Sequence, residues 1–200
     1  YYSKSALNER VRLQFDREAD HVVELVQERM QKYEVALRSG VAFIDASGGD
    51  VDFANWKQYA DSVNIQSEYP GINGIGVIHA LSKEEVPDYL VEQRQARPGL
   101  QIHPPHEDTE HYPITYIIPL ESNLKAVGLD MAHESNRFTA ARKARDTGQS
   151  QITGPITLVQ DSNKTPGFLF YSPFYENGDV PNNHRHAQFC DKVYATFGVT

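Results

Sequence analysis

Residues 1–39 contain neither proline nor glycine, and their apolar side chains recur at steps of mostly three and four. This spacing predicts one long helix with a single apolar stripe, and Gly40 is a candidate for its end or for a bend. A helix of ~35 residues is ~50 Å long, which exceeds the width of a small domain. The stripe must therefore pack on two layers or on a second copy of the chain. It comprises Leu7, Val11, Phe15, Val22, Val26, Met30, Tyr33, Leu37 and Val41.

The other positions of this stretch carry charges of both signs, as a solvent-exposed helix face does. A dimerising stalk that carries a signal is compatible with that interpretation. After the turn at residues 46–50, helical and strand-like segments are interspersed, which indicates an α+β fold with antiparallel sheets. We expect helices over 52–63, 83–97 and 134–147, the second opened by the capping-box spacing of Ser82 and Glu85. We expect strands over 72–81, 114–120, 126–130, 151–153, 156–160, 167–172 and 192–199.

Composition excludes several classes of protein. The net charge of −8 over 200 residues disfavours binding to nucleic acid, and 40 % hydrophobic content excludes general disorder. The single Cys190 excludes an intrachain disulfide and a cysteine-rich zinc site, and a buried structural thiol is its default role. No apolar run reaches the ~18 residues of a membrane helix, and no signal peptide opens the chain. We expect a fragment of a longer protein.

Histidines are the most conspicuous polar residues. Three imidazoles and three carboxylates lie within His103–His111, a composition that could bind zinc. The segment lies between a predicted helix and a predicted strand and contains two prolines, so a solvent-exposed loop is the simpler interpretation, and no metal ligand is assigned. The pair His184 and His186 is interpreted as surface in the same way. The motifs of nucleophilic hydrolases, phosphate-binding loops and dinucleotide-binding folds are absent from the sequence.

Asp130 ends the apolar run 126–130, and its position allows two roles. It either caps the helix that follows or faces a cavity, where it would accept hydrogen bonds from the N–H groups of a ligand. Arg137 and Arg145 lie eight residues apart on the next predicted helix, and an ion pair with a nearby acid is the default for each.

Six stretches together resemble the CHASE domains, the extracellular sensory modules of histidine kinases and nucleotide cyclases. They occur in the family's order and at its spacing over residues 70–197. The stretches are PGINGIGV at 70–77, YPITYIIP at 112–119, AVGLDM at 126–131, TGPITLVQ at 153–160, GFLFYSPFY at 167–175 and VYATF at 193–197.

The resemblance implies a long N-terminal helix followed by tandem PAS-like lobes with antiparallel sheets. The corresponding divisions are a stalk and dimerisation helix at 1–45, a membrane-distal ligand-binding lobe at 46–160 and a truncated membrane-proximal lobe at 161–200. It also implies a periplasmic or extracellular sensor without catalytic activity or cofactor. Such a sensor would form a homodimer through its first helix, and flanking helices outside this sequence would anchor it in the membrane.

In the plant members, which are cytokinin receptors, an aspartate equivalent to Asp130 binds an adenine-type ligand. The resemblance therefore implies that Asp130 anchors a small molecule, assisted by the carbonyl near Ile152. Strand alternation puts Ile114 and Tyr116 on one face, where they would line the cavity. Phe170 and Thr147 complete the predicted ligand contacts. Two alternatives stay open: a metal-dependent enzyme that uses His103–His111, and a structural ectodomain without a ligand.

Overall fold

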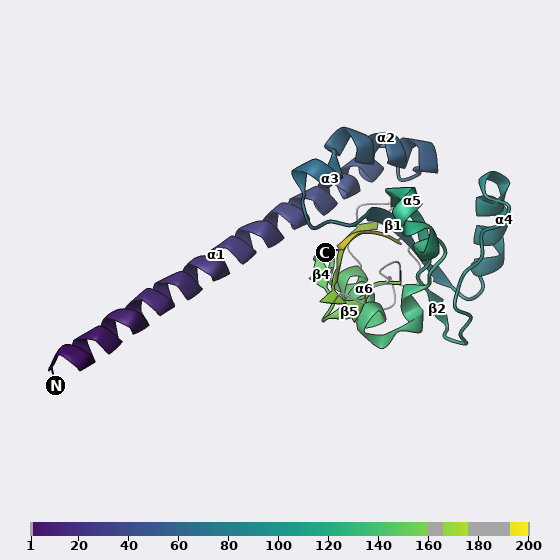
Figure 1. The fold of residues 1–200 in the computed structure, drawn as a ribbon. Coiled ribbons are helices and arrows are strands. Elements are labelled where there is room, and N and C mark those ends of the chain that lie inside the picture. The colour runs from purple at the N-terminus through teal and green to yellow at the C-terminus, as the bar shows by residue number, and fades with distance from the viewer. Residues whose placement is uncertain (1, 160–165, 176–192, 200) are drawn as a thin grey trace.

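The computed structural model describes residues 2–159, 166–175 and 193–199. Its first element is the helix α1 (Tyr2–Ala46), which projects from the body of the molecule as a single rod (Figure 1). Gly40 neither ends nor bends this helix. Instead, α1 ends in two glycines with positive φ, Gly48 at 80° and Gly49 at 85°. Their N–H groups donate to the carbonyls of Asp45 and Ile44, the pairing typical of a helix end with a left-handed glycine.

Only the C-terminal third of α1 packs on the body. Tyr33, Leu37 and Ile44 are buried there, whereas the stripe residues from Leu7 to Val26 are between 55 % and 69 % exposed. Helix α2 (Phe53–Val63) lies beside this packed part and is followed by the short α3 (Ile65–Glu68). The Asp52 side chain caps α2 by accepting a 2.7 Å hydrogen bond from the N–H of Asn55. The helix predicted over 52–63 is therefore confirmed.

The main sheet is antiparallel throughout, as predicted. Its order is β2-β1-β8-β7-β4, and β3 also pairs with β1. A separate pair, β5 with β6, forms a small second sheet. The strand bounds are β1 Ile75–Ser82, β2 Glu110–His111, β3 Ile114–Ile118, β4 Gln151–Ile152, β5 Ile156–Thr157, β6 Pro166–Gly167, β7 Leu169–Tyr175 and β8 Val193–Val199.

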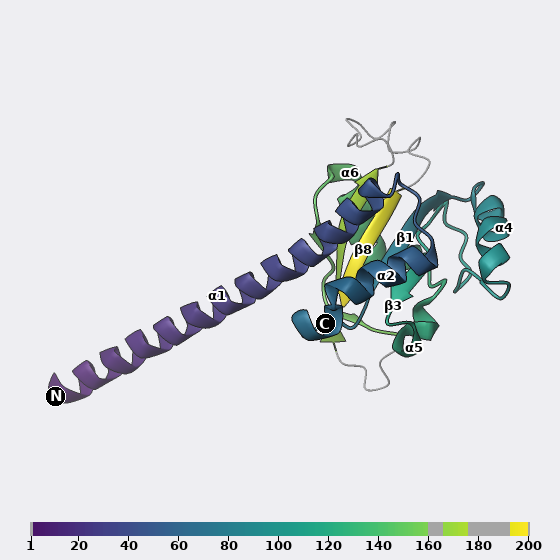
Figure 2. The ribbon, with the colours of Figure 1, turned by 90° about the horizontal axis from the view of Figure 1, so that it is seen from above.

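Helices cover both faces of this sheet. Helices α1 and α2 pack on one face, and α6 (Ser135–Thr147) packs on the other (Figure 2). The Glu134 carboxylate caps α6 by accepting from the N–H groups of Asn136 and Arg137, and Gly148 ends it at φ 67°. Helix α4 (Val86–Ala96) lies beyond β1 and β2, while α5 (Leu120–Asn123) and η1 (Leu124–Ala126) follow β3. The helices predicted over 83–97 and 134–147 thus correspond to α4 and α6.

Two local expectations are wrong. The predicted strand over 126–130 is a turn with two isolated bridges, Leu129 to His103 and Asp130 to Pro113, because Gly128 adopts φ 79° and interrupts the extended backbone. The predicted common face of Ile114 and Tyr116 fails because Thr115 is an extra residue in β3. Val77 and Ile78 of β1 face Tyr116 and Ile114 respectively, so the alternation resets at this bulge.

Described helices include none that combines the length and the apolar composition needed to cross a bilayer. Mixed helix and antiparallel sheet behind a long first helix agree with the predicted α+β class. The division at residues 45 and 160 stays a prediction, and the strand pairing places β7 and β8 in one sheet with β1 and β4.

Candidate functional site

The Asp130 side chain is buried and has four hydrogen-bond partners. It is 0 % exposed, and both of its oxygens accept hydrogen bonds. Oδ1 accepts from the backbone N–H groups of Tyr112 (2.7 Å) and Ala132 (2.9 Å), so Asp130 caps η2 (Met131–His133). Oδ2 lies 2.8 Å from His106 Nε2 and 2.7 Å from His111 Nδ1. These four donors offset the cost of burying a carboxylate.

The backbone around Gly128 brings the 101–106 segment to Asp130. The His103 N–H donates to the Gly128 carbonyl at 2.9 Å, and the Asp130 N–H donates to the His103 carbonyl at 2.8 Å. A Cβ at Gly128 would lie 2.0 Å from the Gln101 carbonyl oxygen, a separation that no side chain tolerates. Glycine is therefore required here both for its positive φ and for this close approach.

Strand β2 carries His111 and holds it in position next to Asp130. His111 pairs with Leu81 of β1, and its neighbours are tied to α6 through Arg145. Arg145 Nη1 donates to Glu110 Oε1 and to the Tyr112 hydroxyl, both at 2.6 Å. The ion pair expected for Arg145 is thus confirmed, and it holds the strand that carries His111.

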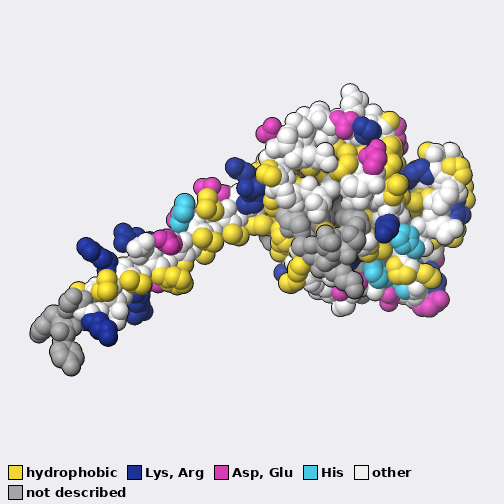
Figure 3. Space-filling model, in the orientation of Figure 1, with side chains coloured by type: hydrophobic (Ala, Val, Ile, Leu, Met, Phe, Trp, Pro, Cys, Tyr) yellow, Lys and Arg dark blue, Asp and Glu magenta, His cyan; other side chains and the backbone are white. Residues whose placement is uncertain are grey.

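Beside the two imidazoles lies a hollow of about 490 Å³ between α4 and the 101–107 segment. Histidine side chains gather on this part of the surface, close to β2 and next to hydrophobic side chains (Figure 3). The volume is in the range of small-molecule sites. The lining residues are Lys83, Val86, Pro87, Leu90, Arg94, Gln101, Ile102, Pro104, Pro105, His106, Glu107 and His111.

A buried polar network lies between α4 and the sheet. Thr115 Oγ1 shares hydrogen bonds with His79 Nδ1 (2.6 Å) and with the Tyr89 hydroxyl (2.9 Å). Burial raises the pKa of Tyr89 from 10.0 to about 12, against the opposing effects of the Thr115 hydrogen bond and the Arg97 charge. Arg97 itself donates to the Thr115 carbonyl and lies over the Tyr116 ring. The α4 flank is therefore rich in buried hydrogen bonds.

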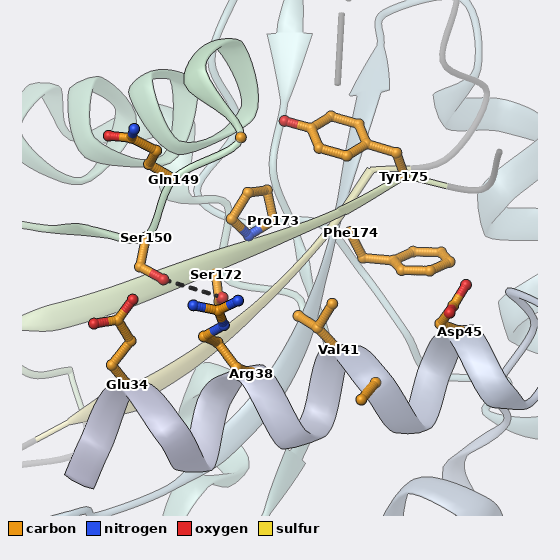
Figure 4. A pocket seen from close by; sticks show the side chains of 12 residues that line it. Glu34, Arg38, Val41, Asp45, Gln149, Ser150, Ser172, Pro173, Phe174 and Tyr175 are labelled. Atoms are coloured by element: carbon orange, nitrogen blue, oxygen red, sulfur yellow. Dashed lines mark hydrogen bonds between the residues drawn. The ribbon is translucent and has the colours of Figure 1, made fainter. Parts of the chain in front are cut away.

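A second hollow, of about 610 Å³, separates α1 from the end of β7. Figure 4 shows Glu34, Arg38 and Asp45 of α1 facing residues 172–175 of β7 across it. Ser150 and Ser172 share a 3.2 Å hydrogen bond at its far side. This hollow lies where the stalk meets the sheet.

The structure does not gather the other predicted ligand contacts around Asp130. Ile114 packs in the core on the α6 side, whereas Tyr116 and Phe170 pack in the core on the α1 side. Ile152 is 46 % exposed, and Thr147 is exposed at the end of α6, where its hydroxyl donates to the Lys143 carbonyl. Between the sheet and α6, beside Tyr112 and Arg145, a cavity of only about 10 Å³ is open, enough for one water.

Sequence reasoning missed the convergence of His106 and His111 on Asp130. The solvent-exposed interpretation of 103–111 is wrong for His111, which is buried, and for His106, whose side chain is 13 % exposed. The density of imidazoles in this segment is the signal that could have found the cluster. His184, His186 and Cys190 lie outside the described residues.

Comparison with known families agrees with the motifs. A family model for the CHASE domain matches residues 49–200, which begins at the turn that ends α1. No curated protein matches the chain. The match covers most of the chain, including the sheet, the hollow beside α4 and the whole Asp130 cluster.

Proposed function

The chain belongs to the CHASE domain family, and from this premise we propose that it is the extracytoplasmic ligand-binding sensor of a transmembrane receptor. CHASE domains are in general extracellular sensory domains of signalling receptors and are not themselves catalytic. The finer proposal is that this domain binds a small molecule and passes the signal through its flanking helices to a histidine kinase or a cyclic-dinucleotide enzyme. Helices on both faces of one antiparallel sheet support the PAS-like part of this proposal.

The observation that carries the proposal is the continuity of α1. One helix runs from the exposed stripe at Leu7 into the core at Leu37 and Ile44 without a break. Its packed end contacts Phe170 and Phe174 of β7 within one apolar cluster. A rearrangement of the sheet would therefore move a rigid rod, since helices transmit displacement along their axes. A ligand produces such a shift only if it binds one arrangement better than the other.

We place the ligand in the hollow beside α4. Asp130 cannot contact it directly, because it is 0 % exposed and both of its oxygens are engaged. His106 and His111 lie between Asp130 and the hollow, so they would contact the ligand while Asp130 orients them. An adenine-type ligand is one candidate. Direct contacts from Ile114, Tyr116, Phe170, Thr147 and Ile152 stay predictions.

A thermal-shift screen tests the ligand site. The panel contains adenine derivatives, other purines, amino acids and small carboxylates. A ligand at 100 times its Kd adds ~2.7 kcal/mol, which raises Tm by roughly 5–11 °C for a chain of this size. Leu90→Trp fills the hollow and should abolish the shift, whereas Val91→Trp, at a position 67 % exposed on the same helix, should leave it intact. A shift that survives Leu90→Trp and disappears in Ala42→Trp would move the site to the hollow at α1.

The exposed stripe of α1 supports a parallel homodimer as the signalling unit. Its five residues from Leu7 to Val26 would be covered by the same stripe of a second copy. In a Cys190→Ser background, Val22→Cys should form an interchain disulfide on mild oxidation, because it lies on the stripe. Asp20→Cys, about 200° around the helix, is the matched control and should not. Equal cross-linking at both positions would contradict this pairing.

A further inference from the structure

The cluster of His106, His111 and Asp130 has the composition of a transition-metal site. Each residue offers one ligand atom, and these atoms all lie within 4.8 Å of one another. The three come from different parts of the chain: the 101–109 segment, β2 and the start of η2. Two imidazoles and one carboxylate form the ligand set of many zinc sites that keep an open coordination position.

The distances fit a metal after a small expansion. Asp130 Oδ2 is now 2.8 Å from His106 Nε2 and 2.7 Å from His111 Nδ1, as hydrogen bonds require. In a tetrahedral zinc site with bonds of about 2.0–2.2 Å, neighbouring ligand atoms lie about 3.3 Å apart. These two carboxylate–imidazole pairs therefore each need to open by about half an ångström, while the two imidazole nitrogens already lie within 4.8 Å of each other. A metal ion would replace the protons that the two imidazoles share with the carboxylate.

The surroundings of the cluster hold two of the three ligands, Asp130 and His106, in position. Asp130 Oδ1 is fixed by the N–H groups of Tyr112 and Ala132, which leaves Oδ2 directed at the imidazoles. His106 Nδ1 now accepts a 3.3 Å hydrogen bond from the Asp108 N–H and lies 3.0 Å from Asp108 Oδ2. When Nε2 binds a metal, its proton moves to Nδ1, where Asp108 accepts it. Such a carboxylate behind a histidine ligand fixes the imidazole and raises its basicity.

Access to the cluster is available from one side. His106 and His111 line the 490 Å³ hollow beside α4, together with Pro104, Pro105 and Leu90. Asp130 is closed off from solvent at the opposite side. A fourth coordination position would therefore face the hollow and hold water or an exchangeable ligand atom.

We propose that His106, His111 and Asp130 bind a divalent transition-metal ion of the zinc class, with one coordination position open to the hollow. The proposal does not depend on the sensor function, because metal ion alone tests it. It differs from the interpretation of the cluster as a hydrogen-bonded structural element, which predicts no metal affinity. It also adds Asp108 as a positioning residue.

The test is a zinc titration of the whole chain after removal of metal with a chelator. Calorimetry should show one Zn²⁺ per chain, and saturating Zn²⁺ should raise Tm by roughly 5–11 °C. His106→Gln should weaken binding at least ~100-fold, since changes to residues behind a ligand already cost 10–100-fold. The glutamine amide keeps a donor for Asp130 Oδ2, so the variant should retain its circular dichroism spectrum. Asp108→Asn should weaken binding by about 10-fold.

Three controls make the test decisive. His103→Gln changes a histidine of the same segment whose Nε2 bonds to the Val127 carbonyl, and it should leave zinc affinity unchanged. Titrating zinc with every compound of the ligand panel omitted should leave zinc binding unchanged, which separates this proposal from the proposed ligand site. Absence of zinc binding to the wild-type chain would overturn the proposal. So would binding that survives His106→Gln and disappears in the double variant His184→Gln/His186→Gln.

Discussion

The α1–α2 flank and the α4 flank of the sheet are both buried, but by different kinds of contact. On the α1–α2 flank, Leu37, Trp56 and Ile75 are each 0 % exposed and pack in one apolar cluster. On the α4 flank the fully buried residues include Thr115 and Asp130, which are held by hydrogen bonds. The apolar contacts are non-directional and depend on how completely the space is filled, whereas the polar ones require each partner. The domain thus combines an apolar attachment for α1 with a polar flank that changes when a hydrogen-bond partner is lost.

The largest expected effect is on the apolar flank. Leu37→Ala removes a side chain that is 0 % exposed, and we expect a loss of about 2–5 kcal/mol in unfolding free energy because a cavity remains. Val35→Ala, two residues away at a position 62 % exposed, should change stability by less than about 0.5 kcal/mol. Urea unfolding of both variants measures the difference. Equal losses would show that the packed and exposed sides of α1 are wrongly assigned.

The apolar flank is also the part that the sequence predicts best. The spacing of Tyr33, Leu37 and Val41 predicted the stripe, and the Asp52 cap of α2 agrees with the predicted start of that helix. Periodicity is a local property, so it cannot show at which residue the apolar stripe of α1 begins to pack on the body of the molecule. That depends on β7 and β8, more than a hundred residues later.

The polar flank was predicted only in part. The capping role of Asp130 follows from its position before η2, but its imidazole partners lie 24 and 19 residues earlier. Their approach depends on the positive φ of Gly128, and the bulge at Thr115 depends on pairing with β1. Neither feature has a periodic signal. The site was therefore beyond prediction from pattern alone, although its residue types were visible.

The second prediction uses alkaline pH to affect the polar flank. Burial raises the pKa of Tyr89 to about 12 from 10.0, so the folded state holds the phenol proton more tightly than the unfolded state. The contribution of the protonated Tyr89 to the free energy of unfolding is fully present below pH 10 and disappears as the pH rises through about 12. At about 1.4 kcal/mol per pKa unit this amounts to about 3 kcal/mol. Unfolding free energies between pH 9 and about 12 should fall less steeply in Tyr89→Phe than in wild type. Identical slopes would mean that Tyr89 is not buried as described.

The third prediction concerns the buried hydrogen bond between Thr115 and Tyr89. It compares the cost of removing one partner with the cost of removing both. Thr115→Val keeps the shape of a residue that is 0 % exposed but leaves the Tyr89 hydroxyl without this partner. We expect a loss of about 1–3 kcal/mol. Adding Tyr89→Phe should recover part of it, because both ends of the hydrogen bond are then apolar. A double-mutant cycle with coupling near zero would contradict the assigned hydrogen bond.

The smallest effect concerns the turn that ends α1, where neither apolar burial nor a side-chain hydrogen bond is at stake. Gly48 has φ 80°, and no atom lies within 4 Å of the place that a Cβ would occupy. Gly48→Ala should therefore cost only the left-handed backbone strain, about 1 kcal/mol. Gly99 has equally open space without a positive φ in the left-handed range, so Gly99→Ala should be neutral or stabilise by up to about 1 kcal/mol. Thermal unfolding compares the two. If Gly48→Ala costs as much as Leu37→Ala, then the packed end of α1 depends on this turn as much as on its apolar contacts.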